Sequence, residues 1–385
     1  MMRILLVSSS SGSRGGGELF LLSLAESLRA MGHEPSLWTS THPRMDELSY
    51  KFNGIGPVHR ESYLNTYDRR FRSFSDAADV RSARRVAVSW KKLAPDIVHL
   101  NKQNLEDGLD LIWAARFCSL PTVCTIHVTQ TARFLKARHG WARDAVARAV
   151  LNRYPGRLVA IGASRRSDLN RFLGAHNRKG AELVENGVPL PSPQELERLR
   201  RETRRQLGLD DGHLLGLGVG RMVEQKRPLL FLEYAGQIAA LEPRARFCWI
   251  GDGPLRPQWE AKVAAQTWGN RVSAPGWAQR VLPYYAAADF FLHTAGFEGL
   301  PLALLEAMAA GLPCVVTSNL FDDLEFLKLT RVLRAGGGGW IAALTDAAQR
   351  DELGEDCRDL VARRYSVERM AQGYLALYER AVAGR

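Results

Sequence analysis

Residues 289–317 read DFFLHTAGFEGLPLALLEAMAAGLPCVVT, and this stretch decides the fold. The apolar runs 289–292 and 313–317 have the length of buried strands, and between them residues 302–310 have apolar side chains at helical spacing. We predict Pro301 at the first helical position and Gly311 just past the helix end, where these residue types are favoured. A strand, a helix and a second strand in this order predict parallel pairing in an α/β sheet.

The same alternation runs through the whole chain of 385 residues, which is long enough for two α/β domains. Prolines at positions 189, 191 and 193 form a stiff linker, and we predict domains over 1–190 and 191–365 on either side of it. The expected strands are 3–9, 35–39, 96–100, 121–126, 158–161 and 182–185 in the first half, and 214–219, 246–250, 289–292 and 313–317 in the second.

The net charge of +11 is concentrated in one block. Residues 131–180 hold twelve Lys or Arg against Asp144 and Asp168, and residues 133–154 alternate these cations with apolar side chains. The block predicts an anionic partner, and a helix over 133–154 would suit a membrane surface. The alternative is a solvated face of basic helices with no partner. The five cysteines lack metal-ligand spacing, so we expect reduced thiols and a cytoplasmic protein.

Two carboxylates flank the predicted helix start in the quoted stretch. The amides of Gly299, Leu300 and Leu302 and the helix dipole there would form an anion site suited to a diphosphate. Glu306 can lean back toward this site, and Glu298 precedes it. The alternative is that both glutamates are helix-capping charges.

Other strand ends carry further candidates. Arg221 and Lys226 follow the strand 214–219 and could both bind a diphosphate, or could be ordinary exposed loop cations. The loop 12–18 lets backbone approach a ligand through its glycines, or is a plain tight turn. His127 follows a strand where a ligand site should open, or is a satisfied loop residue.

Several classes of protein are disfavoured by missing motifs. The loop 12–18 matches neither the dinucleotide fingerprint nor the P-loop, and there is no Gly-x-Ser-x-Gly elbow. No Asp-x-Asp and no Cys/His cluster occurs, so we expect no bound metal and no cofactor. Aromatic stacking platforms for single strands are lacking, so we expect no nucleic-acid partner.

Taken in order along almost the whole chain, the motifs resemble glycosyltransferase family 4, of GT-B fold. They are Gly16-Gly17-Glu18, Gly32-His33-Glu34, Asp96-Ile97-Val98-His99, Thr125-Ile126-His127, Asn186-Gly187-Val188, Gly220-Arg221 with Lys226, Gly251-Asp252-Gly253-Pro254, the Glu298/Glu306 pair and Tyr365-Ser366. The resemblance implies two doubly wound Rossmann-like domains facing across a cleft, with residues 366–385 forming a helix that returns to the first domain.

The resemblance also implies roles. Arg221 and Lys226 would bind the donor diphosphate and stabilise the leaving group, Glu306 would hold the ribose, and Glu298 would contact the transferred sugar. His127 would lie beside that sugar. The remaining donor-binding residues would be Gly16, Gly17, Gly220, Gly253, Gly299, Leu300, Pro301 and Leu302. Two departures bear on the donor. Arg227 stands where the family often has Gly, and could contact phosphate or face solvent. After the strand 313–317, where many members carry Gly-Gly and a Glu, this chain has residues 318–325 and then 335–340, which differ from that pattern.

We therefore predict a retaining, metal-independent transferase that moves a sugar from a UDP- or GDP-sugar to a lipid-linked or membrane-proximal glycan. It would be peripheral on the inner face of the membrane, held there by residues 131–180. The alternatives are a GT-B enzyme with a small soluble acceptor, a GT-B sugar-nucleotide epimerase, and a non-enzymatic binding protein suggested by charge alone.

Overall fold

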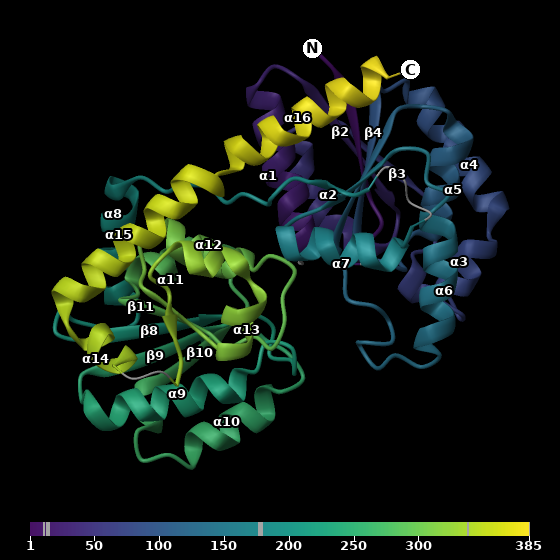
Figure 1. Cartoon of the computed structure of the whole chain (residues 1–385). Helices are drawn as coiled ribbons and strands as arrows, with labels where there is room; N and C mark the ends of the chain where they lie inside the picture. The colour runs from purple at the N-terminus through teal and green to yellow at the C-terminus, as the bar shows by residue number, and fades with distance from the viewer. Residues whose placement is uncertain (11, 13–15, 176–179, 337–338, 385) are drawn as a thin grey trace. The chain divides into compact units, whose positions relative to one another are not determined.

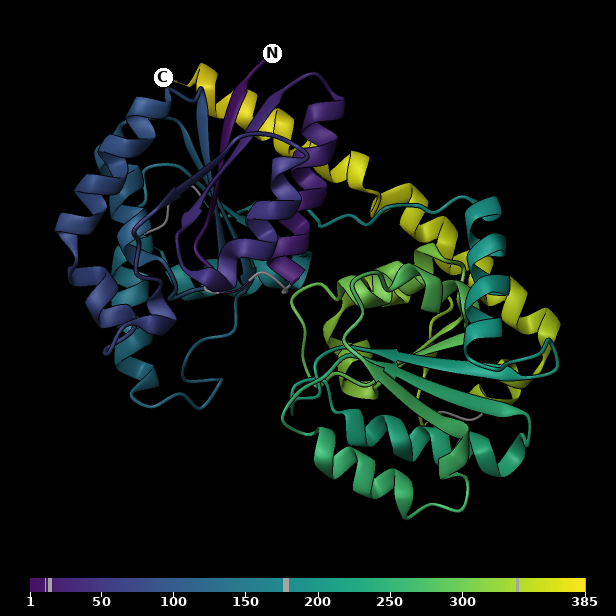
Figure 2. The same cartoon turned by 180° about the vertical axis from the view of Figure 1, so that it is seen from behind.

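The computed structural model describes residues 1–10, 12, 16–175, 180–336 and 339–384, which form two compact units (Figure 1). Unit 1 comprises Met1–Asn186 and Val367–Arg385, and unit 2 comprises Gly187–Ser366. Each unit holds one parallel sheet with helices on both faces, which confirms the predicted doubly wound fold class (Figures 1 and 2). Within the described residues, no helix is both long and apolar enough to cross a membrane.

The unit 1 sheet has seven strands in the order β3-β2-β1-β4-β5-β6-β7. Its strands are β1 (Arg3–Ser8), β2 (Glu34–Ser40), β3 (Val58–Glu61), β4 (Ile97–Asn104), β5 (Thr122–Val128), β6 (Arg157–Ala160) and β7 (Glu182–Leu183). Its helices are α1 (Gly16–Ala30), α2 (Asp46–Asn53), α3 (Ser73–Ala78), α4 (Val80–Leu93), α5 (Leu109–Cys118), α6 (Gly140–Leu151), α7 (Ala163–Leu173) and α16 (Val367–Ala383), with short 3-10 turns at Pro43–Met45 and Thr66–Asp68.

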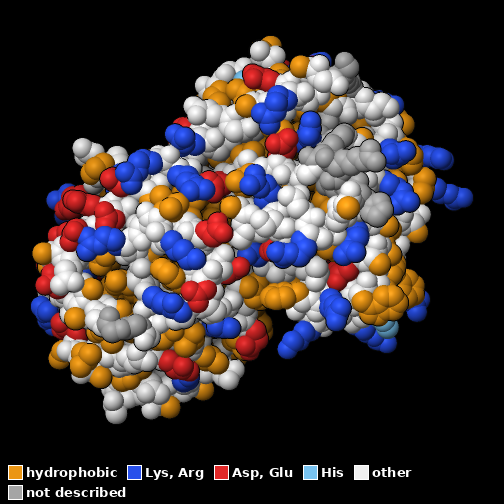
Figure 3. Space-filling model, viewed as in Figure 1, with side chains coloured by type: hydrophobic (Ala, Val, Ile, Leu, Met, Phe, Trp, Pro, Cys, Tyr) orange, Lys and Arg blue, Asp and Glu red, His pale blue; other side chains and the backbone are white. Residues whose placement is uncertain are grey.

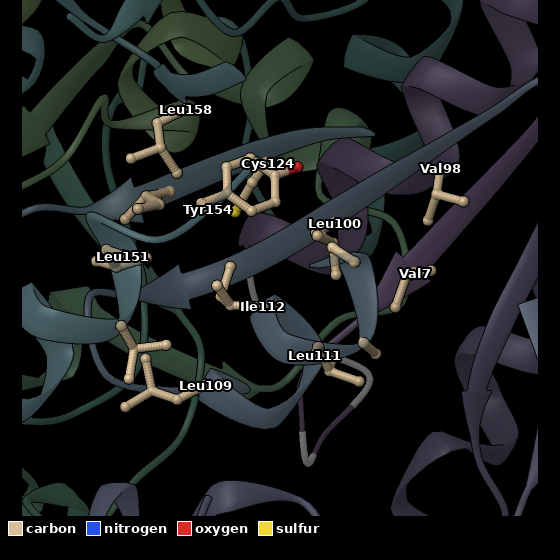
Figure 4. Packing of buried hydrophobic residues seen from close by; sticks show 14 of the residues in the cluster. Val7, Val98, Leu100, Leu109, Leu111, Ile112, Cys124, Leu151, Tyr154 and Leu158 are labelled. Atoms are coloured by element: carbon tan, nitrogen blue, oxygen red, sulfur yellow. The ribbon is translucent and has the colours of Figure 1, made fainter. Parts of the chain in front are cut away.

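The two faces of this sheet bury alternate residues of each strand. In β1, Ile4 and Leu6 pack with α1 and α16, whereas Leu5 and Val7 pack with α4 and α5. Figure 4 shows part of the second layer, where Val7, Val98 and Leu100 of the strands lie near Leu111 and Ile112 of α5. This alternation is the side-chain period of two that a strand covered on both faces requires.

Helix α16 is fixed to unit 1 by two buried tyrosines. The hydroxyl of Tyr378 lies 2.6 Å from Nδ1 of His99, and that of Tyr374 lies 2.8 Å from Oγ1 of Thr125. His99 Nε2 lies 2.8 Å from the same Thr125 hydroxyl, so the four groups form one buried network. Burial lowers the pKa of His99 to about 3, and the imidazole is therefore neutral near pH 7.

The unit 2 sheet has six strands in the order β10-β9-β8-β11-β12-β13. Its strands are β8 (Leu214–Val219), β9 (Ala245–Ile250), β10 (Val272–Gly276), β11 (Phe290–His293), β12 (Cys314–Val316) and β13 (Leu333–Arg334). Its helices are α8 (Pro193–Gln206), α9 (Pro228–Leu241), α10 (Arg256–Ala264), α11 (Leu282–Ala287), α12 (Leu302–Ala309), α13 (Ser318–Asp323), α14 (Trp340–Thr345) and α15 (Ala347–Arg364), with 3-10 turns at Gly269–Arg271 and Glu325–Leu329. All five cysteines of the chain are buried free thiols, as predicted.

The predicted basic helix over 133–154 is wrong in its first part. Residues 132–136, 138 and 139 form turns, and α6 begins only at Gly140. Lys136 (φ 53°) and His139 (φ 55°) adopt left-handed backbone that interrupts a helix. The predicted basic block is also not one surface: Arg143 pairs with Glu106, Arg165 is buried beside Asp168, and Arg178 and Lys179 lie outside the described residues.

Candidate functional site

Three loops of unit 2 meet at the carboxyl edge of its sheet. They follow β8, β11 and β12, which are neighbours in the sheet. The amide of Gly296 donates to the carbonyl of Gln225 (2.8 Å), and the hydroxyl of Thr294 donates to the carbonyl of Lys226 (2.9 Å). Thr317, after β12, donates to the carbonyl of Ala295 (3.1 Å). These bonds hold the predicted cationic loop against the predicted glutamate loop.

Lys226 and Glu298 are in direct contact at this edge. The Lys226 ammonium donates to Oε1 of Glu298, and Nε2 of His293 lies 3.6 Å from the same oxygen. Glu298 is 7% exposed, so its charge would be costly without a cation beside it. The structure thus brings together two residues that the sequence assigned to different parts of the donor.

His293 is a residue of this site that the sequence analysis missed. It is the last residue of β11, is buried, and stacks on Phe291 with a centroid distance of 5.9 Å. Burial and the charge of Lys226 lower the pKa of His293 to about 3. Its Nε2 has no hydrogen-bond partner within the described residues. The neutral ring therefore flanks the Lys226–Glu298 pair without adding charge.

Arg221 lies on the same loop as Lys226 and is exposed. The structure gives its guanidinium no hydrogen bond or ion pair with the described residues. Two of the predicted glycines, Gly220 and Gly253, lie where a larger side chain would collide with this loop. A Cβ on Gly220 would lie 3.2 Å from the Lys226 side chain, and one on Gly253 would lie 2.6 Å from the carbonyl of Met222. The glycines let the loops after β8 and β9 approach each other closely.

Helix α12 follows the glutamate loop but begins one residue later than predicted. Pro301 is the N-cap, with extended backbone (φ −78°, ψ 94°), and Leu302 is the first helical residue. Either position suits proline, which has no amide hydrogen to leave unpaired. Because first-turn amides lack partners inside a helix, the N–H groups of Leu302 and Ala303 are directed out of the helix beside Glu298 and Gly299. Gly311 follows the helix with φ 79°, as predicted for a residue past the end.

Glu306 lies on α12, one helical turn inside. It accepts a hydrogen bond from the hydroxyl of Tyr285 (3.1 Å), which is also 3.0 Å from the carbonyl of Ala303. Burial raises the pKa of Glu306 to about 7, and the bond from Tyr285 offsets part of that rise. Glu306 is therefore a carboxyl group whose charge changes near neutral pH.

Arg227 is the N-cap of α9, has a left-handed backbone (φ 49°) and is exposed. Its Nη1 lies 3.4 Å from Oδ1 of Asn319, and Asn319 in turn donates to the carbonyl of Gly296 (2.6 Å). Arg227 thus joins the atypical segment after β12 to the glutamate loop.

His127 of unit 1 lies in β5 and is buried. Asn101 of β4 donates to the carbonyl of Gly17 (3.0 Å), which makes its Oδ1 the acceptor for His127 Nε2 at 2.6 Å. The rings of His127 and Phe20 pack in a T-shaped arrangement, with their centroids 4.9 Å apart. Burial lowers the pKa of His127 to about 4, although nearby Asp107 raises it. His127 is therefore a neutral group with Nδ1 as its acceptor, and sequence reasoning missed Asn101, which holds it.

The predicted glycines of unit 1 lie at the start of α1. Gly16 is exposed, and a Cβ on Gly17 would lie 2.3 Å from Nε2 of Gln103, which donates to Glu18 (2.8 Å). Residues 13–15 of the predicted loop lie outside the described residues. The predicted site residues therefore form two groups, one at the carboxyl edge of each sheet.

Solved structures share the GT-B fold of this chain. The structure of Anabaena HepE in complex with UDP and glucose matches with a TM-score of 0.75 at 17% identity, over 97% of this chain and 98% of that one. WaaG, a glycosyltransferase involved in lipopolysaccharide biosynthesis, matches with a TM-score of 0.65 at 16% identity, over 99% and 100%.

Sequence comparison gives the family. The family model described as Glycosyltransferase Family 4 matches residues 14–190, and that described as Glycosyl transferases group 1 matches residues 215–353. The chain belongs to glycosyltransferase family 4, as its motifs predicted, and it is a transferase.

Two curated relatives span most of the chain. One is the UDP-Gal:alpha-D-GlcNAc-diphosphoundecaprenol alpha-1,3-galactosyltransferase of Escherichia coli, 26% identical over 84% of this chain and 86% of that protein. The other is the alpha-monoglucosyldiacylglycerol synthase of Streptococcus pneumoniae, 25% identical over 79% and 69%.

Proposed function

We propose that this glycosyltransferase moves a sugar, with retention of configuration, from a UDP- or GDP-sugar to a lipid-linked or membrane-proximal glycan. The contact between Lys226 and Glu298, beside the start of α12, carries the proposal. It puts a cation for a phosphate and an acceptor for a sugar hydroxyl on adjoining loops. Arg221, on the cationic loop and unpaired within the described residues, supplies a second phosphate contact.

The pair divides when the donor binds. Lys226 turns from Glu298 to the diphosphate, and Glu298 then accepts hydrogen bonds from the sugar. As the bond from the anomeric carbon to the diphosphate breaks, Arg221, Lys226 and the α12 amides stabilise the departing charge. The acceptor hydroxyl attacks from the same face, and its proton passes to a diphosphate oxygen. These cations supply the charge stabilisation without a bound metal.

Glu306 holds the nucleotide ribose in this proposal. Its ionised carboxylate can accept hydrogen bonds from two hydroxyls, and Tyr285 fixes one of its oxygens. In unit 1, neutral His127 presents Nδ1 to a sugar hydroxyl, and the first-turn amides of α1 at Gly16 and Gly17 suit a phosphate.

The acceptor class rests on the relatives. The Escherichia coli relative is named for a diphosphoundecaprenol-linked acceptor and a UDP-sugar donor, and the pneumococcal relative for a glycolipid. A lipid-linked acceptor places the enzyme at the cytoplasmic face of a membrane, with exposed cations of residues 131–180 toward anionic lipid.

A nucleotide-sugar screen followed by product analysis tests the proposal. A true donor at about 100 times its Kd should stabilise the fold by about 2.7 kcal/mol. With that donor, Arg221→Ala, Lys226→Ala and Glu306→Ala should each lower turnover, whereas Lys262→Ala, which removes another Lys–Glu pair of unit 2, should not. Full activity of all three variants would exclude this site. The products must be free nucleoside diphosphate and a new glycoside of retained configuration, since an epimerase would form no glycoside.

A further inference from the structure

Large apolar side chains are exposed together on two segments of unit 1 that are far apart in the sequence. We call residues 64–74 and 131–141 the aromatic surface. The exposed fractions there are 51% for Leu64, 41% for Tyr67, 62% for Phe71, 38% for Phe74, 60% for Phe134, 42% for Leu135 and 73% for Trp141. Exposed apolar groups gathered in this way mark an interaction site, whereas scattered ones are ordinary.

Both segments are fastened to the start of α6. Glu106 accepts from Arg143 of α6 (2.7 Å) and from Ser73 (3.0 Å), which holds the first segment against the helix. Asp144 of α6 accepts from the amides of Ala132 (2.7 Å) and Arg133 (3.1 Å), which holds the second. The exposed side chains therefore stand on one rigid base and not on independent loops.

The backbone of both segments is locally strained. Arg72, Lys136 and His139 have positive φ of 46°, 53° and 55°. Such backbone costs free energy for residues other than glycine and persists where the surroundings fix it, often at binding sites.

The exposed charge on the aromatic surface is positive. Asp68, an acidic residue of this surface, forms an ion pair with Arg44. Arg69 forms ion pairs with Asp76, Asp79 and Asp110. The exposed cations that remain are Arg70, Arg72, Arg133, Lys136 and Arg138. Arg72 lies over the ring of Tyr67 (5.5 Å) and Arg70 over that of Phe71 (5.3 Å), so charge and aromatic area are interleaved.

The second segment of the surface follows closely in the chain after the candidate residues of unit 1. Residues 131–141 continue the chain from β5, which ends at Val128 beside His127. In Figure 3, orange and blue side chains adjoin at the end of unit 1 that carries α3 and α6. A ligand bound there would therefore sit a few residues along the chain from the imidazole that we assign to the acceptor.

We propose that the aromatic surface docks this enzyme on an anionic lipid bilayer, with its aromatic rings in the headgroup region and its cations on lipid phosphates. Aromatic rings interleaved with arginine and lysine are what such an interface binds. This inference rests on the proposed function for its membrane partner. It replaces the predicted basic block 131–180 with a smaller surface. That surface includes residues 64–74, where no sequence pattern indicated a partner.

Vesicle sedimentation without nucleotide tests the inference. At low salt the wild-type chain should sediment with vesicles of phosphatidylcholine and phosphatidylglycerol, and weakly with pure phosphatidylcholine. The variant Phe71→Ser/Phe134→Ser/Trp141→Ser should lower the partition coefficient about tenfold or more at an unchanged melting temperature. Tyr50→Ser, 80% exposed on α2, should leave it unchanged.

The charge contribution has a matched control. Arg133→Gln/Arg138→Gln should lower partitioning about tenfold, because each cation near an anionic surface adds to binding. Lys91→Gln/Lys92→Gln removes the same charge from the last turn of α4, outside the aromatic surface. This variant should have little effect.

Three results would overturn the inference: no sedimentation of the wild type with anionic vesicles, equal sedimentation of all variants, or a change of molecular mass in solution when the aromatic residues are removed. The last would identify a protein interface. Donor stabilisation should be the same in the wild type and the aromatic variant. If no nucleotide sugar stabilises either protein while the vesicle results hold, the proposed donor chemistry fails and the docking surface stands.

Discussion

The carboxyl edges of the two sheets differ in how they hold polar groups. In unit 2 the edge carries formal charges, with exposed Arg221 and the contact between Lys226 and Glu298. In unit 1 the groups that hold His127 are neutral and joined by hydrogen bonds, from Gly17 through Asn101 to His127, and the charged Glu18, Lys102 and Asp107 nearby are fixed by partners of their own. Charged groups that can exchange partners suit a leaving diphosphate, whereas a fixed neutral network suits the positioning of sugar hydroxyls. In our proposal the same fold thus serves two kinds of chemistry.

The largest effect is expected from the charged edge. Lys226→Ala should lower kcat by about 10²–10³, the cost of removing one preorganised group that stabilises transition-state charge. Steady-state kinetics with the identified donor measures this. Asn101→Ala in unit 1 should change kcat less, because it removes no charge.

A stability control separates folding from chemistry. Lys226→Ala leaves buried Glu298 without its cation and should lower the unfolding free energy by about 2 kcal/mol, while Lys226→Ala/Glu298→Ala should recover part of that loss. If the double variant is as unstable as the sum of the two single variants, the pair is not coupled as described.

The buried network that joins His99 to α16 should be sensitive to acid. The folded-state pKa of His99, about 3, is below the unfolded value of about 6.5, so the folded chain cannot take up the proton. Its contribution to stability is therefore present above about pH 6.5 and is lost as the pH falls. Relative to His99→Gln, the wild type should lose about 2 kcal/mol between pH 7 and pH 5, measured by denaturant titration. A constant difference across that range would mean that folding does not shift the pKa of His99.

Nucleotide affinity should depend on pH through Glu306. Its pKa of about 7 means that the ribose-binding carboxylate forms as the pH rises. If the ionised form binds, affinity should rise about tenfold from pH 6 to pH 8, measured by calorimetry. Glu306→Gln has no titrating group, so a similar slope in that variant would assign the dependence elsewhere.

The smallest effect is expected at Arg227. Its left-handed backbone (φ 49°) favours glycine, so Arg227→Gly should stabilise unit 2 by about 1 kcal/mol. The matched change in unit 1 is Ala94→Gly (φ 48°), which should give a similar gain. A loss at Arg227 with a gain at Ala94 would show that the contact with Asn319 outweighs the strain.

Much of the fold was predictable because strands buried on both faces are continuous apolar runs. β8 was predicted with its observed bounds, and β9, β11 and β12 within one residue at each end. The edge strands β3, β10 and β13 were missed: β3 is polar, β10 contains Pro275 and Gly276, and β13 has two residues. Such strands exist through pairing with a neighbour, which a local pattern does not reveal.

The site was predicted by residue type and chain order, but not by contact. Lys226 and Glu298 are separated by 72 positions, and their pairing follows from β8 and β11 being neighbours, which the order of strands along the chain does not give. His293 and Asn101 each fall one position past a predicted strand, 289–292 and 96–100, and belong to no motif that would single them out. The aromatic surface was half found: the basic residues of 131–141 stood out, whereas residues 64–74 join them only through Glu106 and Arg143.

The exchange of Lys226 from Glu298 to the donor diphosphate is the central claim, and calorimetry of a nucleoside diphosphate on the wild type and on Glu298→Gln tests it most directly. Because the amide releases Lys226 while a nucleoside diphosphate has no sugar for Glu298 to contact, the variant should bind it about three- to tenfold more tightly, yet transfer sugar far more slowly. Weaker binding of the nucleoside diphosphate by Glu298→Gln would contradict the claim, since Glu298 would then support the phosphate site instead of competing with it.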